Sequence, residues 1–235
     1  MNGPSFGPLV DRATLDRLAR ELADRDPSLG RILSALGPPP LWRRPATYAT
    51  LVRIVLEQNV SLASAKSTYD RLLDACGGRV TAKAVLGDVG EAGLRQIGFS
   101  RQKAGYATGL ARAVRDRRLP IGRLGRLTDD QVRETLTPFR GIGDWTVDIF
   151  LLMALRRPDV FPGGDLAVRK GMETLDGTDY SDRQAMRRRA DRWRPYRSVA
   201  CRMVWQFYLH GRRRGIGSQG SLSLAANQID PLAGG

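Results

Sequence analysis

Two glycines and a lone carboxylate form the pattern in this chain that could most readily do chemistry. Gly141 and Gly143 lie in the segment LTPFRGIGDWT, residues 136–146, and Asp165 follows further along the chain. Glycine adopts positive φ without strain and leaves neighbouring backbone N–H groups uncovered. Such N–H groups, with the N-terminus of the helix expected at 144–155, form a neutral site for a phosphate or another anion. A carboxylate near that site could act on the bound molecule.

The charge of the chain favours a polyanionic partner such as nucleic acid. Its 235 residues include 38 Lys and Arg against 24 Asp and Glu, which gives a formal net charge of +14. Much of the excess lies between Arg183 and Arg214, where eleven arginines accompany one acid, Asp191. A GC-rich genome explains the preference for arginine, and a solvated helix face explains part of the run, but such faces usually mix both signs. We therefore expect some of these arginines to contact phosphate.

Several other kinds of site and location find no support in the sequence. The two cysteines, Cys76 and Cys201, form no C-x-x-C pair, and His210 is the single histidine. Neither a disulfide framework nor a zinc or other metal site is therefore expected. No signal-peptide pattern opens the chain, and no apolar run has the length of a membrane span. We expect a cytoplasmic protein, associated with the nucleoid if its source is bacterial.

The spacing of apolar residues predicts helices throughout and no strand, so the expected fold class is all-α. Apolar residues recur three and four positions apart, which is the period of a helix with one buried face. Thr128…Gln131 and Ser181…Gln184 have the capping-box pattern that marks a helix start. The predicted helices are 10–23, 48–58, 63–76, 90–96, 103–116, 129–136, 144–155, 166–175, 182–193 and 198–210.

Composition divides the chain into three parts. The proline run at 38–40 separates an N-terminal helical arm, residues 1–40, from the main domain, residues 41–214. Residues 215–235 are rich in Gly, Ser, Ala and Asn without periodicity, so they are expected to form a flexible tail.

Four motifs in order resemble the helix-hairpin-helix DNA glycosylase superfamily over roughly residues 45–210. The opening segment, with DVFPGGD after it, is similar to the family's hairpin followed by a Gly/Pro-rich loop and an Asp. The family's I-x-x-Q-Q-x-S helix and turn is similar to TLVRIVLEQNVSLASAKSTYDRL, residues 50–72. Its L-x-x-x-G-h-x-x-x-K-A unit, in which h is a hydrophobic residue, is similar to GLRQIGFSRQKAGYATGLARAV, residues 93–114. RWRPYRSVACRMVW (192–205) resembles the W-x-P-x-R-S-x-A helix of the alkylbase, or 3-methyladenine, branch.

The resemblance implies two helical subdomains with the active-site cleft between them. The hairpin-bearing subdomain would span roughly residues 62–163, and the remainder of the domain would form the second subdomain. The partner would be double-stranded DNA with a damaged base, because enzymes of this family flip such a base out of the duplex before they cut its N-glycosidic bond. We expect the protein to be a monomer.

Asp165 matches the catalytic aspartate of this family. An ionised carboxylate there would stabilise the positive charge that the sugar gains as the N-glycosidic bond breaks. Its place at the N-terminus of the helix expected at 166–175 would favour the ionised form. Taken alone, an Asp after two glycines would be explained as a helix N-cap, and the two roles can coexist.

Trp145 separates branches of the family. Bifunctional relatives carry at this position a lysine that attacks the sugar and leads to a strand cut. Because Trp145 stands there, the resemblance implies a monofunctional enzyme without lyase activity. The chain also lacks the C-terminal four-cysteine cluster that holds an iron–sulfur cluster in the endonuclease-type relatives.

The resemblance also supplies candidates for contacts with DNA. The wedge that fills the gap left by the flipped base corresponds to Gln58, Asn59 and Val60, although Glu57 precedes them where many relatives have glycine. A cationic base would be held by aromatic faces. The candidate DNA-binding residues are Gly141, Ile142, Gly143, Thr146, Arg140, Lys170 and Arg197, and the candidate pocket aromatics are Trp145, Tyr48, Trp205 and Tyr208.

The function that the resemblance implies is removal of alkylated purines of the 3-methyladenine type, the first step of base excision repair. Two alternatives stay open: the same fold acting on deaminated, oxidised or mismatched bases, and a non-catalytic helix-hairpin-helix module that binds DNA. A pure binding module has no need of Asp165, because a carboxylate would weaken its affinity for phosphate. No cofactor is required, although the hairpin carbonyls could hold a monovalent or divalent cation.

Overall fold

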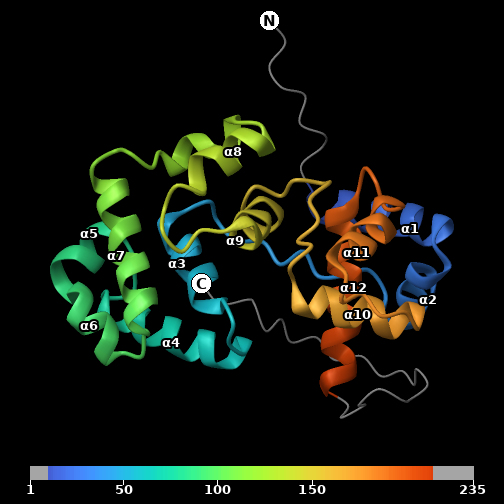
Figure 1. Ribbon diagram of the computed structural model, residues 1–235, viewed down its shortest axis with the longest axis horizontal. Helices are drawn as coiled ribbons and strands as arrows, with labels where there is room; N and C mark the ends of the chain where they lie inside the picture. Colours follow the sequence, from blue (N-terminus) through green and yellow to red (C-terminus); the bar gives the residue numbers. More distant parts are fainter. Residues whose placement is uncertain (1–9, 214–235) are drawn as a thin grey trace, which may run out of the picture. The chain divides into compact units, whose positions relative to one another are not determined.

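The computed structural model describes residues 10–213, and within this range every regular element is a helix (Figure 1). The predicted all-α fold class is therefore confirmed for these residues, while the predicted tail at 215–235 lies outside them. The described chain divides into two compact units: residues 44–155 form the first, and residues 10–43 with 156–213 form the second. None of the helices described combines the length and the apolar character that a membrane span requires.

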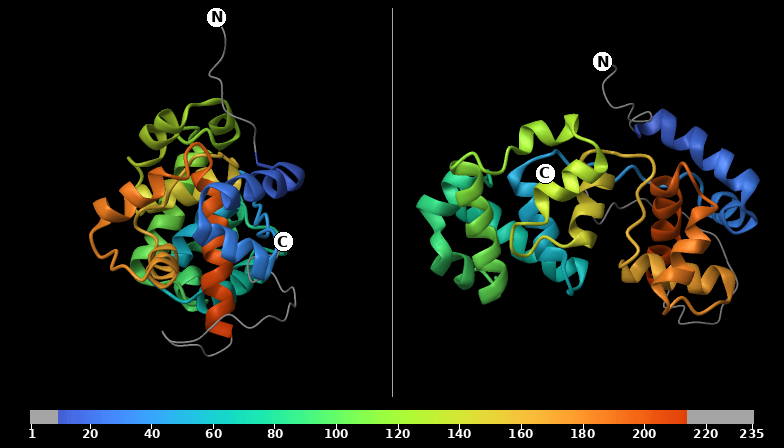
Figure 2. Two further views of the ribbon diagram at one scale, coloured as in Figure 1. Left: turned by 90° about the vertical axis from the view of Figure 1, so that its right-hand side faces the viewer. Right: turned by 45° about the horizontal axis from the view of Figure 1, so that its top comes forward.

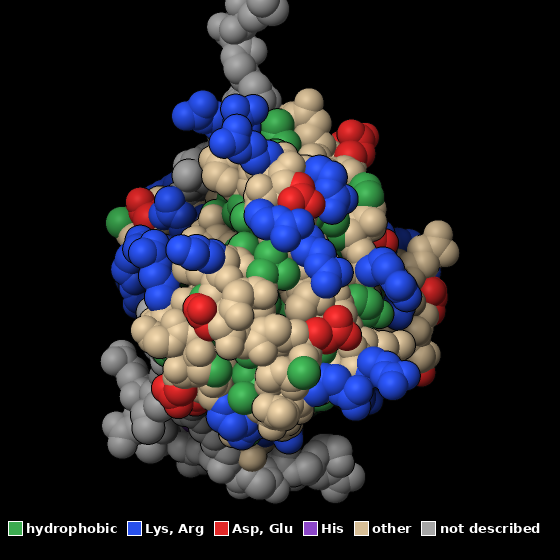
Figure 3. Space-filling view, turned by 90° about the vertical axis from the view of Figure 1, so that its left-hand side faces the viewer, with side chains coloured by type: hydrophobic (Ala, Val, Ile, Leu, Met, Phe, Trp, Pro, Cys, Tyr) green, Lys and Arg blue, Asp and Glu red, His purple; other side chains and the backbone are tan. Residues whose placement is uncertain are grey.

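The first unit is built around α3, Tyr48–Glu57, in which eight of ten residues are buried. Thr47 begins this helix by accepting a hydrogen bond from the Thr50 N–H. α3 contacts α4, Leu62–Ala75, α7, Arg101–Arg115, and α9, Asp144–Ile149. The other elements are α5 (Ala82–Ala84), η1 (Val85–Val89), α6 (Gly90–Gln96), η2 (Ile121–Arg126), α8 (Asp129–Leu136) and η3 (Phe150–Ala154). Figure 3 looks onto the side that carries α5, α6 and α7, and basic side chains are prominent there.

The second unit is organised around α12, Arg197–Arg213, which contacts α1, Arg12–Arg25, α2, Pro27–Leu36, and α10, Leu166–Asp176 (Figures 1 and 2). α11, Arg183–Asp191, completes it. Gly171 in α10 faces α12: a Cβ there would lie 2.5 Å from Val204 Cγ1 and 3.1 Å from the Val204 carbonyl oxygen. The absence of a side chain at Gly171 therefore permits the close approach of these two helices.

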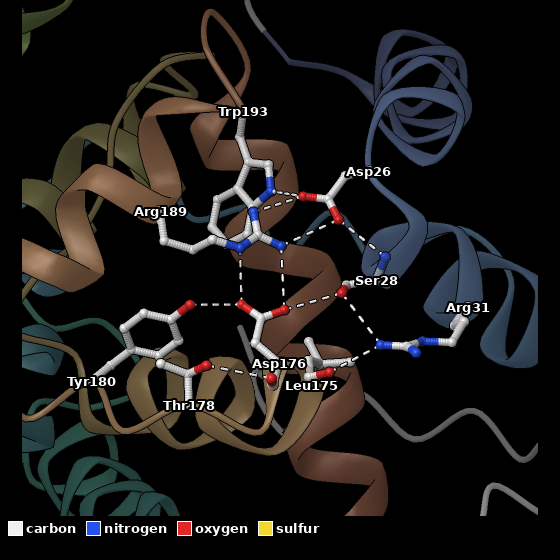
Figure 4. A network of polar contacts seen from close by, with 9 residues as sticks. All are labelled: Asp26, Ser28, Arg31, Leu175, Asp176, Thr178, Tyr180, Arg189 and Trp193. Atoms are coloured by element: carbon white, nitrogen blue, oxygen red, sulfur yellow. Dashed lines mark hydrogen bonds and ion pairs between the residues drawn. The ribbon is translucent and has the colours of Figure 1, made fainter.

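A buried polar network joins the first two helices of the second unit to α10 and α11 (Figure 4). Arg189 Nη1 lies 2.7 Å from Asp26 Oδ2, and Arg189 Nε lies 2.9 Å from Asp176 Oδ2. Trp193 Nε1 also donates to Asp26, at 2.8 Å. Burial alone would raise the pKa of Asp26, but the hydrogen bonds from Arg189 and Trp193 outweigh burial and lower the pKa below its usual value. Residues far apart in sequence are thus tied together by paired charges.

Some elements differ from the sequence prediction. The capping box at Thr128 and Gln131 is confirmed, but the one predicted at Ser181 is wrong. Asp182 caps α11 instead, because its two carboxylate oxygens accept hydrogen bonds from the N–H groups of the two residues after Arg183. The helix α2 and the short elements α5, η1 and η2 were not predicted, and the helix predicted at 144–155 becomes a π-helix over its second half, η3.

Candidate functional site

A glycine hairpin at residues 137–143 joins α8 to α9 in the first unit. Gly141 has a φ of +88°, and a Cβ there would overlap the ring of Tyr106 on α7. Glycine is therefore required both by the backbone conformation and by the packing. Gly143 is exposed and precedes α9 without a side-chain cap. A helix start that no side chain caps is a suitable place for an external anion.

Gln58 connects the end of α3 to this hairpin. Its Nε2 donates to the Gly141 carbonyl oxygen at 2.8 Å and to Thr146 Oγ1 at 2.9 Å. Thr146 is only 1% exposed, so the predicted DNA contact faces the interior of the unit. The exposed part of the predicted wedge is Asn59, which has a φ of +55°, and Val60, which is 45% exposed. Gln58 thus holds the hairpin, while the next two residues face outward.

Two charged side chains hold the turn after α3. Lys103 Nζ, from α7, donates to the carbonyl oxygens of Leu56 at 2.7 Å and Gln58 at 2.8 Å, which satisfies acceptors at the end of the helix. Burial lowers the pKa of Lys103. Glu57 accepts hydrogen bonds from the Arg44 guanidinium at 2.7 and 2.9 Å, in a buried bidentate pair. This pair gives a structural role to the acid that departs from the family pattern.

Asp165 is the N-cap of α10 in the second unit and is 9% exposed. Its Oδ1 accepts a hydrogen bond from the Val168 N–H at 2.9 Å, as an N-cap does. The same oxygen accepts a second hydrogen bond from Trp205 Nε1 on α12, at 3.0 Å. Because both donors meet one oxygen, α10 and α12 together fix the orientation of the carboxylate.

The start of α12 also fixes the loop that leads to Asp165. Arg197 makes charge-assisted hydrogen bonds to Asp159, with Nε 2.8 Å from Oδ1 and Nη2 3.0 Å from Oδ2. Ser198 Oγ accepts a hydrogen bond from the Val160 N–H at 2.9 Å. The Arg-Ser pair of the fourth motif therefore positions the loop, and Arg197, which was predicted to contact DNA, is bound to Asp159.

The four predicted pocket aromatics have different surroundings. Trp205 is buried and packs edge-to-face on Trp42, with ring centroids 6.1 Å apart. Tyr48 is a core residue of the first unit: its hydroxyl donates to an α7 carbonyl at 3.0 Å, and burial raises its pKa. Trp145 on α9 and Tyr208 on α12 are partly exposed. Of the four, these two are the more exposed residues.

The predicted phosphate-binding side chains differ in availability. Arg140 is exposed in the hairpin, whereas Lys170 Nζ lies 2.7 Å from Glu173 Oε2 at the surface of α10. Within the arginine-rich stretch, Arg189 and Arg197 are held by aspartates, and Arg202 is fully buried. The exposed arginines on α11 and directly after it are Arg183, Arg187, Arg188, Arg192 and Arg194.

Three residues that the sequence did not single out contribute to the site. A Cβ on Gly163 would lie 2.9 Å from Arg187 Nε, so the exposed Arg187 side chain crosses the loop before Asp165. Lys103 holds the turn after α3, and its position in the Lys-Ala motif was the one available signal. No motif identified Tyr106 or Arg187, because Tyr106 lies far along the chain from Gly141, and Arg187 lies far along the chain from Gly163.

Comparison with known proteins shows what this chain is similar to. The model of the HhH-GPD superfamily base excision DNA repair protein matches residues 52–195. The chain is 26% identical over 188 residues to a Bacillus subtilis (strain 168) protein provisionally named DNA-3-methyladenine glycosylase YfjP, covering 76% of this chain and 65% of that protein. It is also 26% identical over 162 residues to DNA-3-methyladenine glycosylase 1 of Schizosaccharomyces pombe, covering 68% of this chain and 71% of the relative.

A solved structure has the same fold. The complex of Schizosaccharomyces pombe 3-methyladenine DNA glycosylase with abasic DNA matches with a TM-score of 0.74 at 23% identity, covering 87% of this chain and 100% of that chain. The family model spans more than half of the chain, so the resemblance inferred from the four motifs is confirmed. The chain therefore belongs to the HhH-GPD superfamily of base excision DNA repair proteins.

Proposed function

We propose that this protein is a DNA glycosylase that hydrolyses the N-glycosidic bond of an alkylated purine flipped out of duplex DNA. The observation that carries the proposal is the placement of Asp165, a buried carboxylate fixed by Val168 N–H and by Trp205 Nε1. Family membership and the names of the two relatives support this reaction class.

In the proposed reaction the electron pair of the N-glycosidic bond leaves with the base, and positive charge develops on the sugar. The negative charge of Asp165 stabilises this transition state in a site that its two hydrogen bonds have already ordered. Water then adds to the sugar C1′ and releases a proton, which leaves an abasic site and a free base. A cationic alkylated purine is a good leaving group, so the reaction needs no strong general acid.

Residues of each unit have a different role in the proposed reaction. The hairpin of the first unit, with Gly141, Gly143 and the exposed Arg140, is assigned to the DNA backbone. The exposed turn of Asn59 and Val60 is assigned to the gap that the flipped base leaves. The carboxylate of Asp165 in the second unit is assigned to the sugar.

We also infer that the enzyme leaves the strand uncut. A lyase needs a lysine amine that can attack the sugar, and the family's lysine position holds Trp145. The chain has four lysines. Lys103 donates to two backbone carbonyls, and Lys66 and Lys170 pair with acidic residues. The fourth, Lys83, is an exposed residue of α5 and does not belong to the hairpin. These observations support hydrolysis as the whole reaction.

A panel of duplexes, each with one lesion, tests the substrate class. The lesions are 3-methyladenine, 1,N6-ethenoadenine, hypoxanthine, uracil and 8-oxoguanine, and base release is scored with and without alkali. We expect release of 3-methyladenine and strand cuts only after alkali. Strand cuts without alkali would contradict the monofunctional assignment, and release of uracil or 8-oxoguanine alone would contradict the alkylated-purine assignment.

Asp165→Asn tests the catalytic assignment. Asn caps a helix about as well as Asp, so this variant keeps the start of α10 while it loses the charge. We expect base release to be abolished while duplex binding is retained, which would also exclude a non-catalytic binding module. Asp182→Asn, at the N-cap of α11 in the same unit, is the matched control and should release base at the normal rate. Normal release by Asp165→Asn would refute the assignment.

A further inference from the structure

A second strongly basic surface lies on the first unit, in a segment that the proposed function does not use. It comprises the last turn of α7, the loop after it and η2. One acid, Asp116, accompanies six exposed arginines in this segment. We call it the Arg112–Arg126 surface, and its arginines are Arg112, Arg115, Arg117, Arg118, Arg123 and Arg126.

The charge of this surface is not explained by the general preference for arginine. The helix α1 is of similar length and carries four arginines, but three acids accompany them and three of the arginines form i,i+4 ion pairs. In the Arg112–Arg126 surface, Asp116 alone serves as ion-pair partner, for Arg115 and Arg118. The net charge of α1 is +1, whereas that of the Arg112–Arg126 surface is +5. Both segments share the same compositional bias, so the shortage of acids is a local property.

The backbone that carries these arginines is anchored. Leu119, Ile121 and Leu124 are buried between them, and the Leu119 N–H donates to the Ala113 carbonyl oxygen at 3.0 Å. Apolar residues thus fix the loop and η2 against the unit while the arginines face solvent. An anchored array loses less conformational entropy on binding than a mobile tail does.

Arg117 has a backbone conformation that glycine would adopt more easily. Its φ is +57°, in the left-handed region, and it follows the C-cap of α7, where glycine is the usual residue. A non-glycine residue in this conformation is an outlier that can mark a functional site. The dipole of α7 favours cations nearby, but Arg112 and Arg115 in its last turn already satisfy that preference.

We propose that the Arg112–Arg126 surface binds the phosphate backbone of duplex DNA independently of the lesion. Guanidinium groups match phosphate oxygens in geometry and charge. Contacts with phosphate carry no sequence information, so this surface binds undamaged DNA. The inference goes beyond the proposed function, because it concerns DNA on which no base is released.

The test measures the salt dependence of binding to a short undamaged duplex. The variant Arg112→Gln/Arg123→Gln/Arg126→Gln removes three exposed charges for which the described part of the chain gives no ion pair. Each lost phosphate contact should reduce the slope of log K against log salt by about 0.9, so the slope should fall by about 2.7. The control Arg12→Gln/Arg17→Gln/Arg20→Gln removes the same charge from α1 and should leave the slope unchanged. Equal slopes for the two variants would overturn the proposal.

A second variant separates binding from folding. Arg117→Gly replaces a left-handed arginine by the residue that this conformation favours, so its Tm should equal or exceed that of the native chain. The slope of log K against log salt for this variant should still fall by about 0.9, and an unchanged slope would contradict binding of DNA by this surface. Base release from a damaged duplex at saturating protein should remain normal in both variants. A failure of the proposed function would instead appear as no base release by the native chain, whatever the slopes.

Discussion

At the residue scale, the hydrogen bond from Trp205 separates Asp165 from an ordinary helix cap. Asp182 also caps a helix of the second unit, but it accepts hydrogen bonds from backbone N–H groups, has an ion-pair partner at 3.6 Å in Arg188, and is exposed. Asp165 is buried and accepts one hydrogen bond from the backbone and one from a side chain of another helix. The hydrogen bond from Trp205 Nε1 does not cap α10, so its effect is on the orientation of the Asp165 carboxylate.

We predict that Trp205→Phe lowers kcat for base release while KM changes little. The variant keeps an aromatic ring to pack on Trp42 but loses the Nε1–H donor to Asp165. A hydrogen bond to a charged group contributes about 1.5–3 kcal/mol, so kcat should fall about tenfold or more. Single-turnover and steady-state kinetics on a damaged duplex would measure the two constants.

Trp193→Phe is the matched control for that measurement. It removes a tryptophan Nε1–H donor to Asp26 in the same unit. We expect a lower Tm with normal kcat, because this hydrogen bond holds the polar network and not the Asp165 carboxylate. An unchanged kcat in Trp205→Phe, or an equal loss in both variants, would argue against orientation of Asp165 by Trp205.

At the element scale, the packing of α10 on α12 determines whether Asp165 and Trp205 meet. We predict that Gly171→Ala destabilises the protein by about 1–3 kcal/mol, the usual cost of overpacking, because the new methyl group would clash with Val204. Base release should also fall, since separation of the helices would stretch the Asp165–Trp205 hydrogen bond. Thermal unfolding and base release would be measured on the same samples.

The control at this scale is Gly109→Ala in α7, where an added Cβ would meet no atom within 4 Å. Alanine is favoured over glycine in a helix interior by about 1 kcal/mol, so this variant should be as stable as the native chain or more stable. If Gly171→Ala were equally stable, the close approach of α10 and α12 would not depend on glycine.

The sequence predicted those elements whose signal is local. The helix α8 has a capping box and an apolar period, and its predicted bounds match the structure. The helix α2 was missed although Asp26 and Pro27 give a cap and a first-turn proline, because its pattern is short. The start of α11 was misplaced because Ser181 and Asp182 are both good caps, and their reach to the first N–H groups depends on the loop geometry.

The candidate site was predictable where a motif names the residue and not where packing selects it. The hairpin glycines followed from residue types and spacing, and Asp165 followed from the family resemblance of the motif that contains it. The contacts of Gln58 with the hairpin, of Lys103 with the end of α3, and of Arg197 with Asp159 join segments that lie far apart in the sequence. No periodicity or composition specifies such pairs, because they arise when helices pack against one another.

At the scale of the whole molecule, the count of 38 Lys and Arg overstates the number of cations available to DNA. Arg44, Arg189 and Arg197 form ion pairs with nearby carboxylates while largely buried, so their charge stabilises the unit in which each lies. The exposed arginines of the hairpin, of α11 and of the Arg112–Arg126 surface are the ones that we assign to phosphate. Salt dependence of binding therefore measures the functional charge better than composition does.

We predict that the Asp26 network makes the stability of the whole chain depend on pH. Asp26 and Arg189 are 163 residues apart and join the N-terminal helices to α11. Because the pKa of Asp26 is below its usual value near 3.9, the carboxylate stabilises the fold at neutral pH, and this contribution is lost as the pH falls below about 4. Asp26→Asn should therefore lower the free energy of unfolding by about 2 kcal/mol at pH 7.

The difference between the native chain and this variant should shrink at about pH 3, because the unfolded native chain then takes up a proton at Asp26 more readily than the folded chain does. Urea unfolding followed by circular dichroism at both pH values would measure it. Asp24→Asn is the control, because Asp24 is an exposed residue of α1, the helix that ends just before Asp26. This variant should show little difference from the native chain at neutral pH. A destabilisation by Asp26→Asn that stayed equal at both pH values would mean that the ionised carboxylate is not what joins the two ends of this unit.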